Sequence, residues 1–438
     1  MALAWYVNRN LPILVVGLLA VVSGWPALEP ELTAPAAMLF GDSGSSGLIS
    51  DGVAVWSDWM PLGGAWGLES LQSERLVSLG LWGLLLGALY GLGLALGLSR
   101  WAAVLVVSCA AAHPLIVALH GELAGRGLLT AGALMVLTTA LAWSHDHEHS
   151  RARLAAVFVT SLLACLSNPF ALLLPVILAL SSWMAPKELR GTRVRSRPLV
   201  ASAAPALLVL AARWVQDLPA GVDLSNHGAV VGEEVAPGAG LALVSRAIEA
   251  LNPGRLPIRR PCENDVASLG LDDPGVWLGA LALLVIPMVA RRVIAPAQSL
   301  GLWWLWSILV ACSQIAEPLP SELAPGVVAL GWLGGALLLA SLMDREQVRV
   351  GGLVVSVAVG ALMLPDARQA FASERVALET RVQVCGAAAD PRVRLARHMA
   401  TQGDGKRALS LLDGLKGDSV ISTRFEIHLA RHSWGPLR

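Results

Sequence analysis

Charged residues are scarce in this sequence, and their scarcity argues against an ordinary water-soluble domain. Only 15% of the 438 residues are Asp, Glu, Lys or Arg, whereas soluble domains carry about 25%. Hydrophobic residues make up 55% of the chain, and the mean hydropathy is +0.62. This composition predicts a membrane protein.

Tyrosine and phenylalanine are also scarce, with two and five residues respectively. Proteins that bind nucleic acids combine basic patches with aromatic side chains, and no segment of this sequence combines the two. We therefore expect no nucleic-acid partner. The net charge of zero says little about other partners, because acidic and basic residues are segregated along the chain.

Cysteine is rare as well, with five residues in the chain. Cys109, Cys165 and Cys312 fall within apolar runs, where a thiol usually packs as a small hydrophobic side chain. Cys262 and Cys385 fall in segments that the topology below places outside the membrane. A disulfide between them is a hypothesis that requires this compartment to be oxidising, as a periplasm is.

Long apolar runs, by contrast, are abundant. A helix of about 20 residues crosses the roughly 30 Å hydrocarbon core of a bilayer, and eleven runs approach that length. They predict an all-α polytopic membrane protein with about eleven transmembrane helices. The runs are 11–28, 76–97, 101–119, 127–143, 154–167, 169–184, 199–214, 275–290, 299–316, 325–343 and 351–365.

Two of these predictions leave alternatives. Only the short stretch Ser167-Asn168-Pro169 separates the runs 154–167 and 169–184, so they form either one broken helix or a hairpin. The first run follows a charged N-terminal stretch, as in a signal peptide. Because ten further runs follow it, we interpret it as a retained first span.

The distribution of charge sets the orientation of the predicted helices. Cytoplasmic loops are enriched in Lys and Arg, and a cytoplasmic N-terminus makes the inside loops strongly basic. The first outside loop, residues 29–75, then holds seven acidic residues against the single base Arg75. We therefore expect a bacterial inner-membrane protein with a cytoplasmic N-terminus and a periplasmic C-terminus. The basic residues of the inside loops are Arg100, Arg151, Arg153, Lys187, Arg190, Arg193, Arg195, Arg197, Arg291, Arg292, Arg345 and Arg349.

The chain divides into a transmembrane domain, residues 1–365, and a periplasmic tail, residues 366–438. Besides loop 29–75, the transmembrane domain has a second large outside loop at residues 215–274. This loop contains NPGRLPIRRPCEND at 252–265, and its prolines argue against regular structure.

The tail has the pattern of short amphipathic helices. Residues 390–419 predict two helices that break at 402–405, which is typical of one tetratricopeptide-like hairpin. Residues 420–432 add a half repeat. Since one repeat cannot bury its own apolar face, we expect it to pack on another structure. The facing apolar residues are Leu395, Met399, Ala408, Leu411, Leu412 and Leu415.

Ionisable residues gather in one otherwise apolar region. His113, His120, Glu122 and Arg126 lie close together in the sequence, and an Arg at the centre of a bilayer costs about 2.5–3.5 kcal/mol. The predicted topology instead places residues 113–126 in a turn at the outer membrane surface. Asn168 reaches the same side. The alternative interpretation is an ordinary polar loop in which His113 is packed.

The order of these features resembles that of the GT-C membrane glycosyltransferases, and most of all the tetratricopeptide-bearing group of protein O-mannosyltransferase-like enzymes. The His-Pro motif of this family and the Gly-Arg at the start of its fourth span match His113-Pro114 and Gly125-Arg126, at the family's spacing. LSNPFALLLPVILAL at 166–180 resembles its fifth-span motif. Residues 319–340 resemble its late Leu-Pro span, and residues 371–415 its passage into repeats.

The sequence also departs from the family pattern. The acidic motif after the first span is reduced to Asp42-Ser43, with Asp51 and Asp58 as rivals. Ile116 and Ala118 stand where the family has a second His and a Glu, and Asn168-Pro169 replaces Lys-Glu. A catalytically inactive relative that serves as a membrane scaffold is therefore an alternative.

The resemblance implies transfer of a sugar from a polyprenyl-phosphate donor to a protein or glycan acceptor at the outer membrane face. The attacking hydroxyl needs a carboxylate base, and the resemblance implies Asp42 or Asp51 in that role. It implies that Arg126 binds the carrier phosphate through its forked guanidinium and that His113 orients it. No cofactor is predicted, although a divalent metal would also suit the phosphate. The remaining candidate substrate-binding residues are Glu122 and Asn168.

Other features have simpler interpretations. SHDHEHS at 144–150 resembles a metal-binding run, but we expect a solvated inside connector. Gly83, Gly87 and Gly91 repeat every four residues, which predicts close approach of a neighbouring helix. A transporter is disfavoured because most spans lack central acidic or Lys residues. An O-antigen-ligase-like enzyme stays an alternative because the second outside loop carries Arg255, Arg259 and Arg260.

Overall fold

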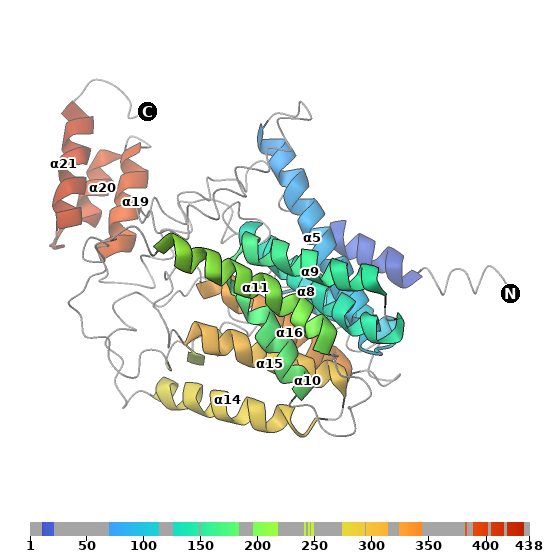
Figure 1. Cartoon of the computed structure of the whole chain (residues 1–438). Coiled ribbons are helices and arrows are strands. Elements are labelled where there is room, and N and C mark those ends of the chain that lie inside the picture. Colours follow the sequence, from blue (N-terminus) through green and yellow to red (C-terminus); the bar gives the residue numbers. More distant parts are fainter. Residues whose placement is uncertain are drawn as a thin grey trace.

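The computed structural model is built from helices, and no strand occurs among the residues that it describes (Figure 1). The prediction of an all-α chain is confirmed for this part of the sequence. The structure describes residues 11–21, 70–113, 126–148, 150–183, 196–217, 274–293, 295–313, 324–343, 389–401, 404–415 and 418–432, with residues 241, 244, 245, 247, 248 and 382.

The helices follow the predicted apolar runs closely. Ten of the eleven runs lie at least in part on described helices, and run 351–365 lies outside the described residues. A first helix covers Leu11–Val21. The others are α5 (Ser70–Ala95), α6 (Arg100–Ala111), α8 (Arg126–Glu148), α9 (Arg151–Ser167), the 3-10 helix η3 (Pro169–Leu173), α10 (Leu174–Trp183), α11 (Ser196–Asp217), α14 (Pro274–Ala290), α15 (Pro296–Cys312), α16 (Ala324–Leu342), α19 (Ala389–Thr401), α20 (Gly405–Leu411) and α21 (Asp418–His432).

Helices α5 and α6 form a tight antiparallel hairpin. Gly97 turns the chain with φ +81°, a conformation that glycine adopts without strain. Ser99 then caps α6 by accepting a hydrogen bond from the Ala102 amide at 3.2 Å. The predicted span 101–119 is too long, because α6 ends at Ala111. Helical backbone geometry is disfavoured for a residue that precedes a proline, and His113 precedes Pro114.

The boundary between α9 and α10 is a break at Asn168. Its backbone is extended (φ −160°, ψ 138°), and its side-chain Oδ1 accepts a hydrogen bond from the Phe170 amide at 3.0 Å. Before the break, α9 packs on α8 and α11, and after the break, α10 packs on α11 and α15. Of the two alternatives, the structure therefore has a broken helix whose second half packs on a different neighbour.

Hydroxyl groups join α8, α9 and α11. Thr138 and Thr160 are hydrogen-bonded through their Oγ1 atoms at 2.7 Å, and the Ser161 hydroxyl donates to the Ser202 carbonyl at 2.9 Å. The short connection and the Thr138–Thr160 pair show that α8 and α9 are antiparallel. Helix α8 also runs past the predicted end of its span to Glu148. The prediction of a loop is thus wrong for residues 144–148, whose backbone continues the helix.

Helices α15 and α16 cross closely at two glycines. A Cβ atom added at Gly334 would lie 2.6 Å from the Gly301 carbonyl oxygen and 3.0 Å from the Trp304 Cβ. Trp304 is 1% exposed, and its Nε1 donates to the Leu330 carbonyl at 2.9 Å. The two backbones approach this closely because glycine has no side chain.

The glycine repeat on α5 does not serve the predicted purpose. A Cβ added at Gly83, Gly87 or Gly91 would meet nothing within 4 Å. The expectation of a close helix partner at these glycines is therefore wrong within the described part of the chain. A repeat of small residues permits close packing, but only the arrangement of neighbouring helices decides whether it occurs.

The three thiols within the helices pack as predicted. Cys165 and Cys312 are buried, Cys109 is half-buried, and all three are free. Cys262 and Cys385 lie outside the described residues, so their disulfide stays a prediction.

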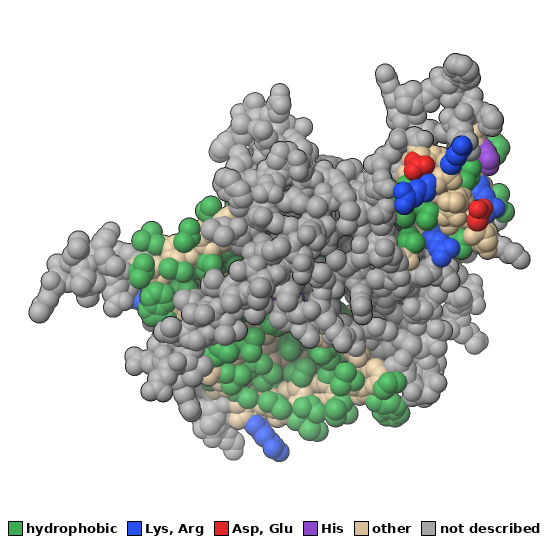
Figure 2. All heavy atoms as spheres, turned by 180° about the vertical axis from the view of Figure 1, so that it is seen from behind, with side chains coloured by type: hydrophobic (Ala, Val, Ile, Leu, Met, Phe, Trp, Pro, Cys, Tyr) green, Lys and Arg blue, Asp and Glu red, His purple; other side chains and the backbone are tan. Residues whose placement is uncertain are grey.

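Outer helices of the bundle expose apolar side chains. On α14, Trp277, Leu281, Leu284 and Met288 follow one helical stripe and are each more than half exposed. Figure 2 shows apolar side chains over much of the described bundle surface and charged side chains on the separate unit α19–α21. Two segments, Ser78–Ala95 and Gly127–Ser144, are long and apolar enough to cross a membrane. The other apolar helices are shorter.

The tail helices α19, α20 and α21 pack on one another and form their own apolar core. The predicted break falls between α19 and α20, and the six predicted facing residues all belong to this core or pack against it. Helix α21 covers the hairpin and buries Val420 and Ile427. The half repeat, helix α21, thus covers part of the apolar face that the hairpin of α19 and α20 could not bury by itself.

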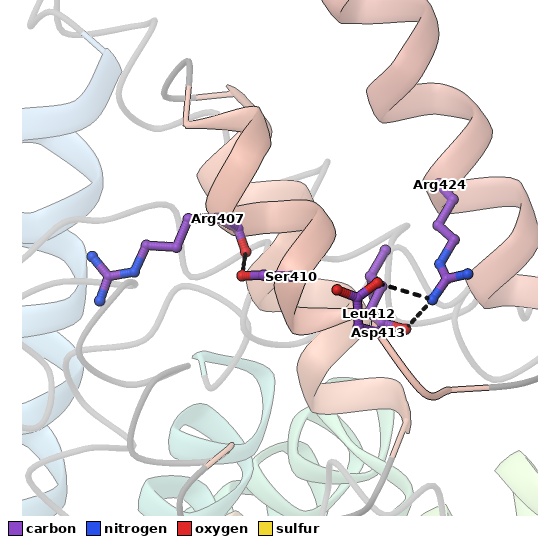
Figure 3. A network of polar contacts seen from close by, with 5 residues as sticks. All are labelled: Arg407, Ser410, Leu412, Asp413 and Arg424. Carbon is purple, nitrogen blue, oxygen red and sulfur yellow. Dashed lines mark hydrogen bonds and ion pairs between the residues drawn. The ribbon is translucent and has the colours of Figure 1, made fainter.

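A single arginine holds the end of α20 against α21 (Figure 3). Arg424 donates through one guanidinium nitrogen to the Leu412 carbonyl, and the same nitrogen lies 3.6 Å from an Asp413 oxygen. The carbonyls at a helix C-terminus lack partners within the helix. Arg424 therefore caps α20, and the exposed ion pair adds little.

We expect Arg424→Gln to loosen this unit by about 1 kcal/mol, the usual contribution of one hydrogen bond. Amide hydrogen exchange in α20 and α21 should then accelerate roughly fivefold. Arg407→Gln is the matched control, because the described hydrogen bonds of Arg407 use its backbone: its amide donates to the Asp404 Oδ1 at 3.3 Å, and its carbonyl accepts from the Ser410 hydroxyl at 2.8 Å. Equal exchange rates in the two variants would contradict the capping role.

Candidate functional site

The helix directions define two ends of the bundle. Trp332, at the middle of α16, contacts the end of α6, and Leu330, in the first half of α16, contacts Gly132 in the first half of α8. Helix α15 is antiparallel to α16. Gly301 contacts Gly334, whereas Trp304, which comes later in α15, contacts Leu330, which comes earlier in α16. The ends of α6 and α9 and the starts of α8 and α16 therefore lie toward one end, which we call the His113 end.

The opposite end carries arginines. It holds the turns α5–α6, α8–α9 and α14–α15, because each of these pairs is an antiparallel hairpin. Arg153 closes one of the turns by donating to the Ser144 carbonyl at 2.9 Å. We call this the arginine end and define it by Arg100, Arg151, Arg153, Arg291 and Arg292.

His113 is packed at the end of α6. Its side chain is 1% exposed, and its ring lies 4.4 Å from the Trp332 ring, centroid to centroid, at an interplanar angle of 33°. Trp332 is itself fixed, because its Nε1 donates to the Cys109 carbonyl at 2.9 Å. The His113 ring therefore anchors the point at which the chain leaves α6, and it has little surface for a substrate to contact.

Asn168 occupies a similar place at the end of α9. It is 7% exposed, and its side-chain oxygen is engaged by the Phe170 amide. The η3 helix that follows packs on α8. The side chain of Asn168 therefore fixes the break between α9 and η3. This break and the end of α6 at His113 both lie at the His113 end.

The remaining predicted site residues are described in part or not at all. Arg126 begins α8, so its backbone lies at the His113 end, but its side chain is outside the described part of the structure. Asp42, Asp51 and Glu122 lie outside the described residues. The structure thus brings His113, Asn168 and the Arg126 backbone to one end of the bundle. That the candidate carboxylates lie near these residues stays a prediction.

Sequence reasoning missed Trp332. It lies in the run LGWLGG between Gly331 and Gly335, and a lone tryptophan in an apolar span gives no signal of its partner. Its contact with His113 joins residues far apart in the chain. No group of three or more His, Cys, Asp or Glu residues suited to a metal ion occurs among the described residues. The polar side chains that described contacts hold in place at the His113 end include the His113 imidazole, the Trp332 indole and the Asn168 carboxamide.

Comparisons with known proteins add no assignment. No family model matches the chain, and neither a curated protein nor a solved structure is found to be similar to it.

Proposed function

We propose that the chain is a polytopic membrane protein with about eleven spans. The exposed apolar stripe on α14 and the exposed Ile13, Leu14 and Leu18 of the first helix support this proposal. Soluble monomers rarely expose contiguous apolar surfaces of this kind. In a bilayer the same side chains face lipid, and the shorter helices cross with the help of flanking polar residues.

The orientation follows from the two ends of the bundle. The arginine end belongs in the cytoplasm because positively charged loops are retained there. The His113 end then faces the periplasm of a bacterial inner membrane. This placement agrees with the acid-rich segment 29–75, which the sequence assigns to the outer side.

Within this framework we propose a glycosyltransferase that uses a polyprenyl-phosphate sugar at the outer membrane face. The observation that carries the proposal is that the ends of α6 and α9 and the start of α8 share the His113 end. Three separate polar elements of the family resemblance therefore meet on one side of the bundle. A lipid-linked donor would reach that side laterally, between helices.

The roles of the residues follow from the chemistry. The acceptor hydroxyl must lose a proton as it attacks the anomeric carbon, and Asp42 or Asp51 is the proposed base. The carrier phosphate departs with the bonding electrons, and Arg126 is the proposed group that stabilises its charge. His113 and Asn168 act as positioning residues, since both are buried. Glu122 is placed near Arg126 by sequence alone.

The proposal is tested by complementation of a gene-deleted strain. We expect Asp42→Asn or Asp51→Asn, whichever removes the base, to lower glycan transfer to outer-face acceptors by at least roughly a hundredfold. Arg126→Ala should also abolish transfer, and Arg126→Lys should restore part of it, because lysine keeps the charge but not the bidentate geometry. The measurement is mass spectrometry of envelope glycans.

The control for this experiment is Asp413→Asn, which removes an exposed carboxylate in the tail. It should leave transfer unchanged. Wild-type glycans in Asp42→Asn, Asp51→Asn and Arg126→Ala alike would remove the site assignment.

An inactive membrane scaffold is the second candidate, and one observation favours it. On α21, Ile421 and Phe425 are 65% and 64% exposed and lie one helical turn apart. Exposed apolar pairs of this kind are typical of surfaces that bind another protein. If deletion of the gene leaves all glycans unchanged, while Ile421→Ser with Phe425→Ser loses a co-purifying protein, the scaffold function is favoured over the transferase.

A further inference from the structure

The arginine end combines positive charge with an apolar border. Arg291 and Arg292 lie in the turn after α14 and are exposed. Met288, one helical turn before Arg292, is 63% exposed, and Val289 is 44% exposed. The exposed surface of α14 therefore changes from apolar to cationic within one turn of helix.

The other hairpins repeat this arrangement. Arg151 is exposed at the start of α9, and Val159, two turns further along, is 50% exposed. Arg100 is exposed where α6 begins. Among the described residues of this end, the five arginines that define it outnumber the two acidic residues at the end of α8, Asp146 and Glu148.

We propose that the arginine end binds the phosphate groups of anionic phospholipids in the cytoplasmic leaflet. A lipid head group bound at the cations would place its acyl chains along the exposed apolar side chains below them, so the surface fits both parts of the molecule. A soluble anion would use the charge only. Guanidinium groups suit this role because they pair with phosphate oxygens in a bidentate manner.

This inference rests on the proposed membrane placement of the chain, and it adds a lipid preference that the placement alone does not require. Positive charge near an anionic surface is attractive within a Debye length. The full-length protein should therefore be stabilised more by anionic lipid than by zwitterionic lipid, and high salt should reduce the difference.

The test uses the purified full chain in detergent micelles doped with phosphatidylglycerol or phosphatidylcholine, with thermal unfolding as the measurement. Phosphatidylglycerol should raise the Tm above the value in phosphatidylcholine. Arg291→Gln with Arg292→Gln should require roughly tenfold more phosphatidylglycerol for the same shift. Arg291→Lys with Arg292→Lys, which keeps the charge, should retain most of it.

Two controls complete the design. Lys406→Gln with Arg407→Gln removes two exposed cations from α20 and should leave the lipid response unchanged. Soluble glycerol phosphate should not replace the lipid. If it does, or if the double glutamine variant responds as the wild type does, the lipid site is overturned.

The outcome separates this inference from the membrane proposal. If the chain stays in solution after lysis without detergent, the membrane placement fails and the lipid site fails with it. If the chain needs detergent but both lipids stabilise it equally, the membrane placement stands and the lipid site alone is overturned.

Discussion

Gly334→Leu is expected to prevent stable folding of the helix bundle. Even a Cβ at this position would lie 2.6 Å from the Gly301 carbonyl oxygen, so a leucine side chain has no volume to occupy. The obstructing atom belongs to the backbone of α15, and no rotamer change can move it away. Helices α15 and α16 must therefore separate, and we expect a cost of roughly 3 kcal/mol or more.

The separation would also reach the Trp304 indole. Its hydrogen bond to the Leu330 carbonyl spans the same interface, so the donor would be left without its acceptor in an apolar surrounding. The expected result is low yield of monodisperse protein in detergent and a large fall in Tm. Fluorescence-detected size exclusion and thermal unfolding measure both.

Gly87→Leu is the matched control. Gly87 is also a mid-helix glycine, but a Cβ there would meet nothing within 4 Å. Leucine has a better helix propensity than glycine by roughly 1 kcal/mol, so this variant should be as stable as the wild type or more so. If Gly334→Leu unfolds at the same temperature as Gly87→Leu, the close crossing of α15 and α16 is not formed.

Trp332→Ala is expected to produce the second large effect, a loss of roughly 3 kcal/mol in the free energy of unfolding. The substitution leaves a cavity beside the buried His113 ring, whose centroid is 4.4 Å from that of the indole. It also removes the donor to the Cys109 carbonyl. Both losses loosen the contact between α6 and α16.

Trp332→Phe separates the two contributions. Phenylalanine keeps an aromatic ring against His113 and loses the indole N–H, so it should cost only about 1 kcal/mol. Trp277→Ala, at a position on α14 that is 64% exposed, controls for the loss of an indole from the surface of the bundle. A stability of Trp332→Ala equal to that of Trp277→Ala would contradict the anchoring of His113.

The same variants bear on the proposed transfer reaction. Since His113 is buried, we expect it to act by holding the end of α6 in place. Transfer by Trp332→Phe should then stay near the wild-type rate, whereas transfer by Trp332→Ala should fall further than its stability at the assay temperature explains. Equal transfer rates in Trp332→Phe and Trp332→Ala would show that the contact between Trp332 and His113 supports the fold but not the transfer reaction.

Much of the local structure could be predicted because it depends on neighbouring residues. Apolar runs of sufficient length specify helices whatever they pack against. The break at Asn168 follows from an Asn that caps and a Pro that begins a helix. The end of α6 was misplaced by an apolar continuation to residue 119, although His113-Pro114 carried the signal. The extension of α8 into SHDHEHS had no comparable signal.

The candidate site could be predicted less well. Sequence order indicated that His113, Arg126 and Asn168 share one side, and the helix directions bring the backbones of all three to the same end. Whether a polar residue contacts substrate or supports the fold depends on its neighbours in space. The burial of His113 and Asn168 therefore could not be predicted from their residue types.

The sequence by itself determined that the chain is helical and apolar, and that its arginines collect in alternate connections, because these properties depend on composition and on residues a few positions apart. Only the tertiary structure decided that Gly301 and Gly334, and not the repeat at Gly83, Gly87 and Gly91, form a close crossing. It alone joined Trp332 to the end of α6, through a hydrogen bond between residues 223 positions apart. The physical reason is that apolar periodicity specifies which face a helix buries but not which of several similar apolar faces will cover it.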